Sequence, residues 1–168
     1  PRRAVTQYLS AERVAEIIQK RGIGACITGV ASYINQDFLR WNSFDKCARV
    51  ANHSDVGVIE LMPIADDKSY AFKYVNGHPS NYRFNLPTVM AFGVLADVET
   101  GVPELVSELT LTTAIRTAAM SAVAARALAR DNCKTMAIIG NGAQSDFQAL
   151  AFHHLLGVEM FHLFDIDT

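Results

Sequence analysis

The sequence of 168 residues lacks the features that mark several large classes of protein. No run of like charge is longer than the pair Arg2 and Arg3, and 15 basic against 17 acidic side chains leave a formal charge of -2, so nothing indicates a nucleic-acid partner. The longest apolar stretch, Met90 to Ala96, is far too short to span a membrane. The start of the chain leads into a helical pattern rather than a signal peptide. A cytoplasmic location is therefore expected by default.

Cysteine is scarce, and its spacing excludes the common cysteine frameworks. Cys26, Cys47 and Cys133 form no CxxC pair and no Cys/His cluster, so neither a metal site nor a disulfide framework is predicted. We expect three reduced and mostly buried thiols. No Ser/His/Asp or Cys/His arrangement indicates a nucleophilic enzyme either, and His153 and His154 are interpreted as packing or surface residues on a helix.

The composition is that of a folded globular protein. Hydrophobic residues make up 50% of the chain and charged residues 19%. The length fits one ordinary domain or two small ones. Because the sequence begins without Met and stops at Thr168 directly after a strand pattern, we expect that part of a longer polypeptide has been cut away.

The first third of the chain has helical periodicity. An amphipathic helix is predicted from Ser10, which can cap it, to Gly22, which ends it. A second helix is predicted between about Val30 and Phe44, where apolar residues recur at spacings of four and three. It is expected to pack on the sheet that follows.

From Arg49 to Thr110 the apolar pattern alternates with period two, which predicts strands. The predicted strands are Val56–Ile64, Ser69–Val75, Val89–Val98 and Glu104–Leu109. Polar turn-forming links at 66–68 and 99–101 predict antiparallel hairpins. The longer loop Asn76–Asn81 is of a kind that holds a ligand in some proteins and only turns the chain in more of them.

The last third predicts a βαβ unit behind a long helix. Alanine dominates between Thr112 and Arg130, which predicts a helix that permits close approach of another backbone or of a cofactor, or simply a tightly packed connecting helix. A strand at Thr135–Ile139, a helix at Ser145–Leu156 and a strand at Glu159–Phe164 follow.

The strongest motif is the turn Gly140–Ser145 between the first of these strands and the helix. Gly140 allows a tight turn, Gly142 lets the backbone approach a pyrophosphate, and the helix amino terminus offers N–H groups to phosphates. Asp165, at the end of the next strand, would accept hydrogen bonds from ribose hydroxyls, which favours NAD over NADP. Asp167 is the competing residue, and the ordinary alternative for either is a solvated strand-end carboxylate.

Three charged residues interrupt the apolar strand patterns. Alternation places Lys73 on the strand face opposite its aromatic neighbours, where an ammonium needs an acidic partner or an anionic ligand. Glu60 could be that partner, and Arg49 could hold a substrate carboxylate through its planar fork. A structural ion pair on an exposed sheet face explains the same spacing equally well.

Arg116 stands among small side chains of the alanine-rich helix. We place it in the first turn, where the helix dipole favours anions, so the misfit indicates an anionic ligand such as phosphate or carboxylate. The alternative is an exposed arginine whose charge costs the helix little stability.

Taken together, these segments resemble the ornithine cyclodeaminase and mu-crystallin family over nearly the whole chain from about Phe38. The matching segments are Arg49–Ala51, Gly57–Pro63, Phe72–Pro79, Met90–Asp97, Ser107–Thr110 and Gly140–Ser145. The bacterial ornithine cyclodeaminase branch is the most similar, through the Phe-Asp-Lys lead into Arg49 and the Gly-Asn-Gly-Ala-Gln-Ser turn.

The resemblance implies an α/β fold in which a mixed-sheet substrate-binding and dimerising domain precedes a Rossmann NAD-binding domain. In this chain it implies the first domain at residues 1–112, and the connecting helix and first βαβ of the second at 113–168. It also implies site residues. Substrate binding is assigned to Arg49, Lys73 and Arg116, catalysis to Glu60 and Lys73, and NAD contacts to Thr88, Arg116, Ala143, Gln144 and Asp165, besides the glycine-turn residues Gly140, Gly142 and Ser145.

The activity implied is conversion of L-ornithine to L-proline and ammonia in a homodimer. Bound NAD takes hydride from the α-carbon, the δ-amine attacks the resulting imine, ammonia leaves, and hydride returns. The alternatives are an imine reductase or amino-acid dehydrogenase of the same family, or a non-catalytic small-molecule-binding relative. Because the family's chains continue well beyond the position of Thr168, through a catalytic aspartate and the rest of the Rossmann sheet, this chain alone is expected to bind NAD poorly and catalyse little.

Overall fold

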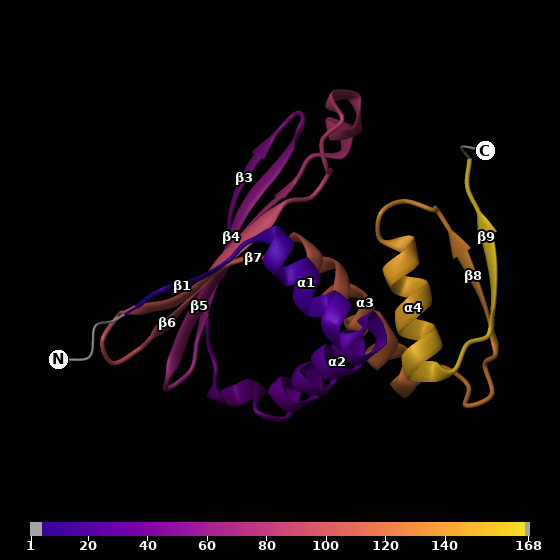
Figure 1. Cartoon of the computed structure of the whole chain (residues 1–168), viewed down its shortest axis with the longest axis horizontal. Helices are drawn as coiled ribbons and strands as arrows, with labels where there is room; N and C mark the ends of the chain where they lie inside the picture. Colours follow the sequence, from indigo (N-terminus) through magenta and orange to yellow (C-terminus); the bar gives the residue numbers. More distant parts are fainter. Residues whose placement is uncertain (1–4, 167–168) are drawn as a thin grey trace. The chain divides into compact units, whose positions relative to one another are not determined.

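The computed structural model describes residues 5–166, which form two compact units (Figure 1). The first unit contains the residues up to Ala15 and Arg40–Leu111, and the second contains Glu16–Leu39 and the chain from Thr112 onward. The chain therefore enters each unit twice. The division into a substrate domain at 1–112 and an NAD-binding domain at 113–168 stays a prediction.

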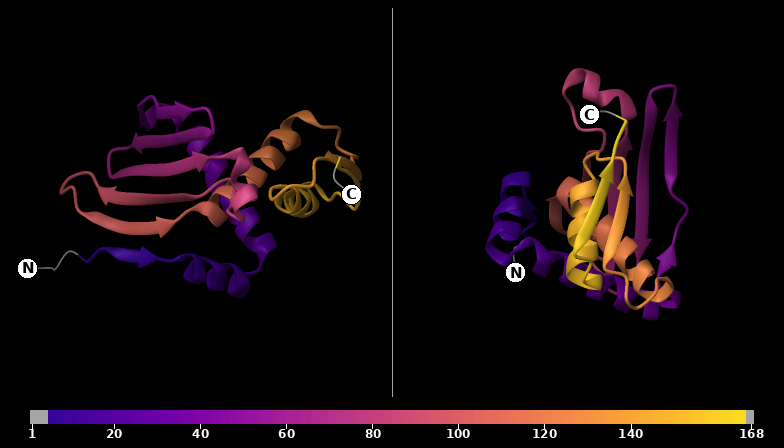
Figure 2. Two further views of the ribbon diagram at one scale, coloured as in Figure 1. Left: turned by 90° about the horizontal axis from the view of Figure 1, so that it is seen from above. Right: turned by 90° about the vertical axis from the view of Figure 1, so that its right-hand side faces the viewer.

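A mixed seven-stranded sheet forms the first unit, and Figure 2 shows its strands side by side. Its path runs β1 (Gln7–Leu9), β7 (Pro103–Glu108), β6 (Ala91–Asp97), β5 (Ser69–Gly77), β4 (Gly57–Ala65) and β2 (Asp45–Lys46), while β3 (Val50–Ser54) also pairs with β4. All neighbours are antiparallel except β1 and β7. The predicted mixed sheet is confirmed.

The four predicted strands correspond to β4, β5, β6 and β7, and the predicted hairpins β4–β5 and β6–β7 are both present. The strands β1, β2 and β3 were not predicted. Two short 3-10 helices, η1 (Trp41–Ser43) and η2 (Pro79–Phe84), lie in the connections of this unit.

The register of the sheet separates its two faces. Lys73 lies opposite Met62 on β4 and Gly93 on β6. Its neighbour Tyr74 lies opposite Leu61 and Phe92, and the Tyr74 and Phe92 rings stack with centroids 5.2 Å apart. Because side chains alternate along a strand, Lys73 faces away from these aromatic rings, as predicted.

Two helices follow β1. α1 (Ala11–Arg21) begins after Ser10, whose Oγ accepts the Arg13 N–H at 3.3 Å, and is followed by Gly22 at φ +85. α2 (Ile23–Leu39) starts earlier than predicted. It packs with α4, whereas the sequence pattern predicts that it packs on the sheet.

The second unit contains α3 (Thr110–Leu128), β8 (Thr135–Ile139), α4 (Ser145–Leu156) and β9 (Met160–Phe164). β8 and β9 pair in parallel, which confirms the predicted βαβ order (Figure 2). The core of this unit is built from small residues on α3 and α4 together with two residues of α2. The fully buried members are Ile27, Ala118, Ala119, Ala122 and Ala151. Alanine lets these three helices approach closely.

The prediction of mostly buried thiols is wrong for Cys47, which is exposed, while Cys26 and Cys133 are half-buried. Within residues 5–166, no helix is long and apolar enough to cross a membrane. The same residues contain no group of three or more His, Cys, Asp or Glu side chains arranged to hold a metal ion.

Candidate functional site

An ion pair joins two of the predicted site residues of the first unit. Arg49 Nη1 lies 3.0 Å from Glu60 Oε1, and the Glu60 side chain is 18% exposed against 60% for Arg49. Arg49 stands just before β3, whose pairing with β4 brings it beside Glu60. The pair holds a partly buried carboxylate under a guanidinium that remains open to solvent.

Lys73 shares a sheet face with Glu60. Glu60 lies opposite Val75, two residues along β5 from Lys73, so the two charged residues are diagonal neighbours. Diagonal neighbours have Cα atoms about 7–8 Å apart, within reach of long side chains. Arg49, Glu60 and Lys73 therefore gather as one charged cluster with two cations and one carboxylate. Such a cluster can bind a carboxylate and move a proton.

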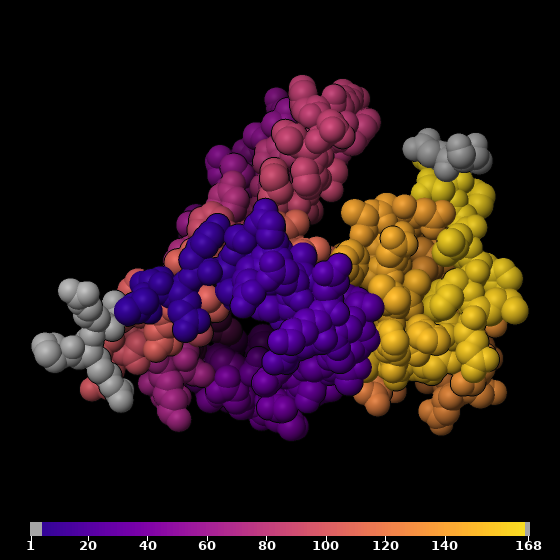
Figure 3. Space-filling view, in the orientation of Figure 1, coloured from indigo at the N-terminus to yellow at the C-terminus, as the bar shows by residue number. Residues whose placement is uncertain are grey.

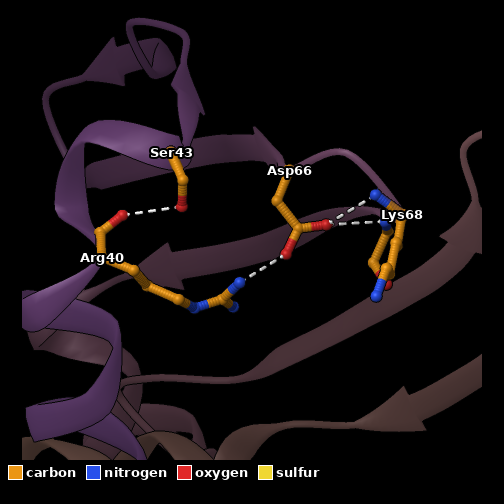
Figure 4. Close-up of polar contacts among 5 residues, drawn as sticks. Arg40, Ser43, Asp66 and Lys68 are labelled. Atoms are coloured by element: carbon orange, nitrogen blue, oxygen red, sulfur yellow. Dashed lines mark hydrogen bonds and ion pairs between the residues drawn. The ribbon is translucent and has the colours of Figure 1, made fainter.

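The segment between α2 and Arg49 is fixed to the β4–β5 hairpin through Arg40 and Asp66. Figure 4 shows Asp66 between Arg40 and the β4–β5 turn. Its Oδ2 lies 2.9 Å from Arg40 Nη1, and its Oδ1 accepts the Lys68 and Ser69 N–H groups at 3.0 and 2.8 Å. The hydrogen bonds from these two N–H groups, and then the one from Arg40, lower the pKa of Asp66 to about 2.

Thr88 lies near the base of the connection between β5 and β6. Its carbonyl accepts the His78 N–H at 2.8 Å, and the residue is exposed. Nearby, Asn76 is only 6% exposed and bonds both His78 and Met90 through its side-chain amide. The loop predicted at Asn76–Asn81 begins later, because Asn76 and Gly77 still belong to β5. The buried polar pair was not predicted, although a polar residue that continues an apolar strand pattern could have indicated it.

The glycine turn Gly140–Ser145 joins β8 to α4 as predicted. Gly140 has φ +94, a conformation that L side chains rarely adopt, and its N–H donates to the Phe164 carbonyl at 2.8 Å. A Cβ placed on Gly140 or Gly142 would meet no atom within 4 Å. Gly142 and Ala143 are exposed. The outer side of the turn is therefore open, and the amino terminus of α4 follows it.

Asp165 is tied to this turn, because its Oδ2 accepts the Asn141 N–H. The carboxylate thus stands at the carboxyl end of β9, beside the glycine turn, where a ribose would follow a diphosphate. The competing residue Asp167 lies outside the described residues. Ser145 Oγ donates to the Gly142 carbonyl at 2.7 Å and closes the turn.

The side chain of Gln144 connects the start of α4 to α3. Its Nε2 donates to the Ala114 carbonyl at 3.0 Å, two residues before Arg116. Arg116 is exposed, in the second turn of α3 rather than the first, because the helix begins at Thr110. The prediction that Arg116 opposes the helix dipole is therefore wrong, since that effect is confined to the first turn. Glu108 provides the negative charge there and accepts the Thr110 and Leu111 N–H groups.

The predicted site residues are divided between the two units. Arg49, Glu60, Lys73 and Thr88 belong to the sheet unit. Arg116, the glycine turn and Asp165 belong to the helical unit. A parallel strand–glycine turn–helix–strand with an acid at the second strand end is the pattern of a dinucleotide-binding protein.

Comparison with known proteins gives the family. A sequence model of the Ornithine cyclodeaminase/mu-crystallin family matches residues 12–168, and the chain belongs to this family. Ornithine cyclodeaminase of Agrobacterium tumefaciens (strain Ach5) is 55% identical over 100% of this chain and 47% of its own length. The chain spans about half the length of the curated ornithine cyclodeaminases it matches.

Two solved structures of similar fold describe ligands. One is a structure of lysine cyclodeaminase that describes the recognition of L-lysine, L-ornithine and L-2,4-diaminobutyric acid. Its TM-score is 0.90, and it is 29% identical over 96% of this chain and 49% of its own length. The other is an archaeal alanine dehydrogenase dimer with bound NAD, with a TM-score of 0.80, 29% identity, and the same two coverages, 96% and 49%.

Proposed function

We propose that this chain forms part of an NAD-dependent cyclodeaminase that converts L-ornithine to L-proline and ammonia by internal hydride transfer. The charged cluster of Arg49, Glu60 and Lys73 carries this proposal, because it offers two cations and a partly buried carboxylate on one sheet face. The 55% identity to an ornithine cyclodeaminase supports the choice of substrate. The sheet unit would supply substrate binding, and the βαβ unit would begin the NAD-binding domain.

Each charged residue has a task in this reaction. Arg49 and Lys73, with Arg116, bind the carboxylate and the amino-acid end of the substrate through charge-assisted hydrogen bonds. Glu60 accepts and returns a proton, which a partly buried carboxylate can do when it lies against the reacting amine. Because Glu60 forms an ion pair with Arg49, a substrate carboxylate would compete with Glu60 for the guanidinium.

The open glycine turn fits a dinucleotide. The space beside Gly140 and Gly142 would take a diphosphate at the start of α4, with Ser145 at the end of the turn. Asp165, whose Oδ2 accepts the Asn141 N–H, would accept hydrogen bonds from the ribose hydroxyls. Thr88, Arg116, Ala143 and Gln144 would make the remaining contacts. When bound, NAD supplies the acceptor and donor of hydride. Relatives with NAD bound share the fold of this chain.

A variant of Lys73 tests the proposal in the full-length protein. We expect Lys73→Ala to abolish release of ammonia and proline while NAD binding, measured by calorimetry, stays within about twofold, since the ammonium contacts substrate and not cofactor. Lys68→Ala, which changes a lysine in the β4–β5 turn, is the matched control and should keep full activity.

The products separate this activity from its relatives. Proline and ammonia formed without net NADH identify the cyclodeaminase. Net NADH formation would instead assign the oxidative deamination of an alanine dehydrogenase, the activity named for one structure of similar fold. Near-normal turnover by Lys73→Ala would remove Lys73 from the site.

We also propose that the protein is a homodimer joined through the sheet face opposite the charged cluster. Leu61 and Phe92 on this face are 42% and 45% exposed, which is unusual for large apolar residues in central strands. Val50, Ile59 and Tyr70 extend the exposed surface on the same face. A second copy of the chain would cover it, as the dimer described for the archaeal alanine dehydrogenase suggests.

A further inference from the structure

The position opposite Lys73 in the sheet has no side chain of its own. Gly93 on β6 lies opposite Lys73 on β5, so the two residues share a sheet face. A Cβ on Gly93 would stand about 4.5–5.5 Å from the Cβ of Lys73. Because Gly93 is buried, another part of the sheet unit fills this place.

The side chain of Leu109 occupies the space over Gly93. A Cβ added to Gly93 would lie 2.5 Å from Leu109 Cδ1 and 2.8 Å from the Phe72 carbonyl oxygen, both closer than a real Cβ tolerates. The end of the leucine therefore stands where the cross-strand neighbour of Lys73 would otherwise be. Only glycine at position 93 lets Leu109 reach this point.

Hydrogen bonds on both sides of Leu109 hold its backbone in place. The Leu109 N–H donates to the Ala91 carbonyl at 2.9 Å, and the Ala91 N–H donates to Thr110 Oγ1 at 2.9 Å. Glu108 Oε1 accepts the N–H groups of Thr110 and Leu111. Since Ala91 is only 7% exposed, the bonds to it are shielded from water. The position of Leu109 is thus fixed within the sheet unit.

Strand β7, which leads into Leu109, is an interior strand. Ser107 lies opposite Gly93 on one side and opposite Leu9 of β1 on the other, and it is 7% exposed. Figure 3 shows the residues of β1, in indigo, in front of the neighbouring strands of the sheet. The space over Gly93 is therefore closed on the side of β7.

On its other side, Lys73 has one apolar and one acidic neighbour on β4. Met62 lies opposite Lys73, and Glu60 lies diagonal to it on the same face. A lysine buries its methylene groups along apolar surface and keeps its ammonium with polar groups. The half-buried Lys73 thus has Met62 and Leu109 along its stem, and Glu60 is the acidic group within reach of its ammonium.

We propose, on the basis of the function proposed above, that Leu109 is a positioning residue for Lys73. It confines the aliphatic stem of the lysine, and so keeps the ammonium in the charged cluster with Arg49 and Glu60, where the substrate carboxylate binds. When Leu109 is shortened, the stem gains rotamers and the ammonium leaves the cluster for part of the time. Leu109 contacts no reacting atom in this role.

The reactivity of the Lys73 amine tests this role without substrate or cofactor. In the full-length protein we expect Leu109→Ala to raise the rate of Lys73 acetylation by N-acetoxysuccinimide at least about fivefold, because a lysine with more rotamers presents its amine to solvent more often. The exposed Lys68 of the same molecules is the reference, and peptide mass spectrometry measures both rates. Leu109→Met keeps the length of the side chain and should stay within about twofold of wild type.

Leu105→Ala is the matched control. Leu105 is also half-buried and lies on the same strand face as Ser107, but it stands opposite Leu95 instead of Gly93. The control loses the same methyl groups from the same sheet, so it reports general loosening of the packing. Its Lys73 acetylation should stay within about twofold of wild type.

Steady-state kinetics of the full-length variants test the consequence for the substrate. We expect Leu109→Ala to raise the KM for L-ornithine about tenfold, or about 1.4 kcal/mol. Both kcat at saturating ornithine and the Kd for NAD should stay within about twofold, because the ammonium then holds the carboxylate less well before and during the reaction alike. Leu109→Met should restore the KM, and Leu105→Ala should keep it. A merely structural role would lower the Tm without separating KM from kcat.

The outcomes that overturn the inference differ from those that overturn the function. Equal Lys73 acetylation in wild type and a folded Leu109→Ala would remove the role of Leu109 and leave the proposed function standing. Faster acetylation with an unchanged KM would also overturn the inference, since the place of the ammonium would not matter to the substrate. If Leu109→Ala fails to fold, Leu109→Val, shorter by one carbon, decides by the same measurements. A wild type that forms no proline from ornithine would overturn the proposed function, while acetylation still decides whether Leu109 confines Lys73.

Discussion

A single carboxylate, Asp66, ties the segment after α2 to the β4–β5 turn. Arg40 and the Lys68 and Ser69 N–H groups all donate to it. All three donors favour the charged form, which explains why the pKa of Asp66 falls to about 2 from its ordinary 3.8. The folded protein thus releases this proton more readily than the unfolded chain.

That difference predicts an acid dependence of stability. The contribution of Asp66 is fully present above the unfolded pKa near 3.8 and is lost as the pH falls through the folded pKa near 2. We expect the Tm of the wild type, measured by circular dichroism, to fall more between pH 4 and pH 2 than the Tm of Asp66→Asn. This pH range spans the unfolded and the folded pKa of Asp66. Asp67→Asn should behave as the wild type; identical acid profiles for all three proteins would contradict the assignment.

At the same scale, alternation along β5 was enough to predict that Lys73 faces away from its aromatic neighbours, because period two is a property of the strand itself. The Arg49–Glu60 ion pair could not be predicted from alternation along one strand. It depends on the pairing of β3 with β4, and the pattern of the sequence did not indicate β3 as a strand. The sequence pattern instead offers Glu60 as a partner for Lys73.

At the level of the elements, the two glycines of the β8–α4 turn have separable tasks. Gly140 has φ +94, so Gly140→Ala should destabilise the fold by about 1–2 kcal/mol. Gly142 needs no positive φ and has open space at its Cβ. Gly142→Ala should therefore leave the Tm unchanged yet weaken NAD binding at least about tenfold, because the methyl group keeps a diphosphate from the backbone.

Calorimetric titration with NAD and thermal unfolding of the same samples measure both effects. Gly101→Ala, at φ +71 in an open hairpin turn, is the control for backbone strain without a ligand. Unaltered NAD affinity in Gly142→Ala would mean that the diphosphate lies elsewhere.

The elements differ in how well local pattern predicts them. The strands β4–β7 and the β8–α4–β9 unit follow from periodicity within each segment. β1 has only three residues and pairs with β7 far along the chain, so nothing local specifies it. The early start of α2 was missed because Gly24 and Gly29 disfavour a helix locally, whereas burial of Ile27 and Ala31 against α3 and α4 compensates.

For the whole molecule, the exposed apolar sheet face predicts an assembly. If the full-length protein is the dimer proposed above, we expect Leu61→Lys or Phe92→Lys to convert it to monomer at micromolar concentration, because a lysine cannot be buried there without a partner. Light scattering coupled to size-exclusion chromatography measures the mass. Val98→Lys, a matched change in the β6–β7 turn, should remain dimeric. Monomeric wild type, or dimeric variants at both positions, would exclude this face as the interface.

The double entry of the chain into each unit also affects its synthesis. α2 leaves the ribosome early, but its partner α4 ends only ~120 residues later, at Leu156. At translation rates of about 5–20 residues per second, roughly 6–24 s pass before that partner exists. During this interval the helix presents Ile27 and its neighbours to solvent or to a chaperone. The two units therefore cannot fold one after the other during synthesis, because each contains an early and a late stretch of the chain.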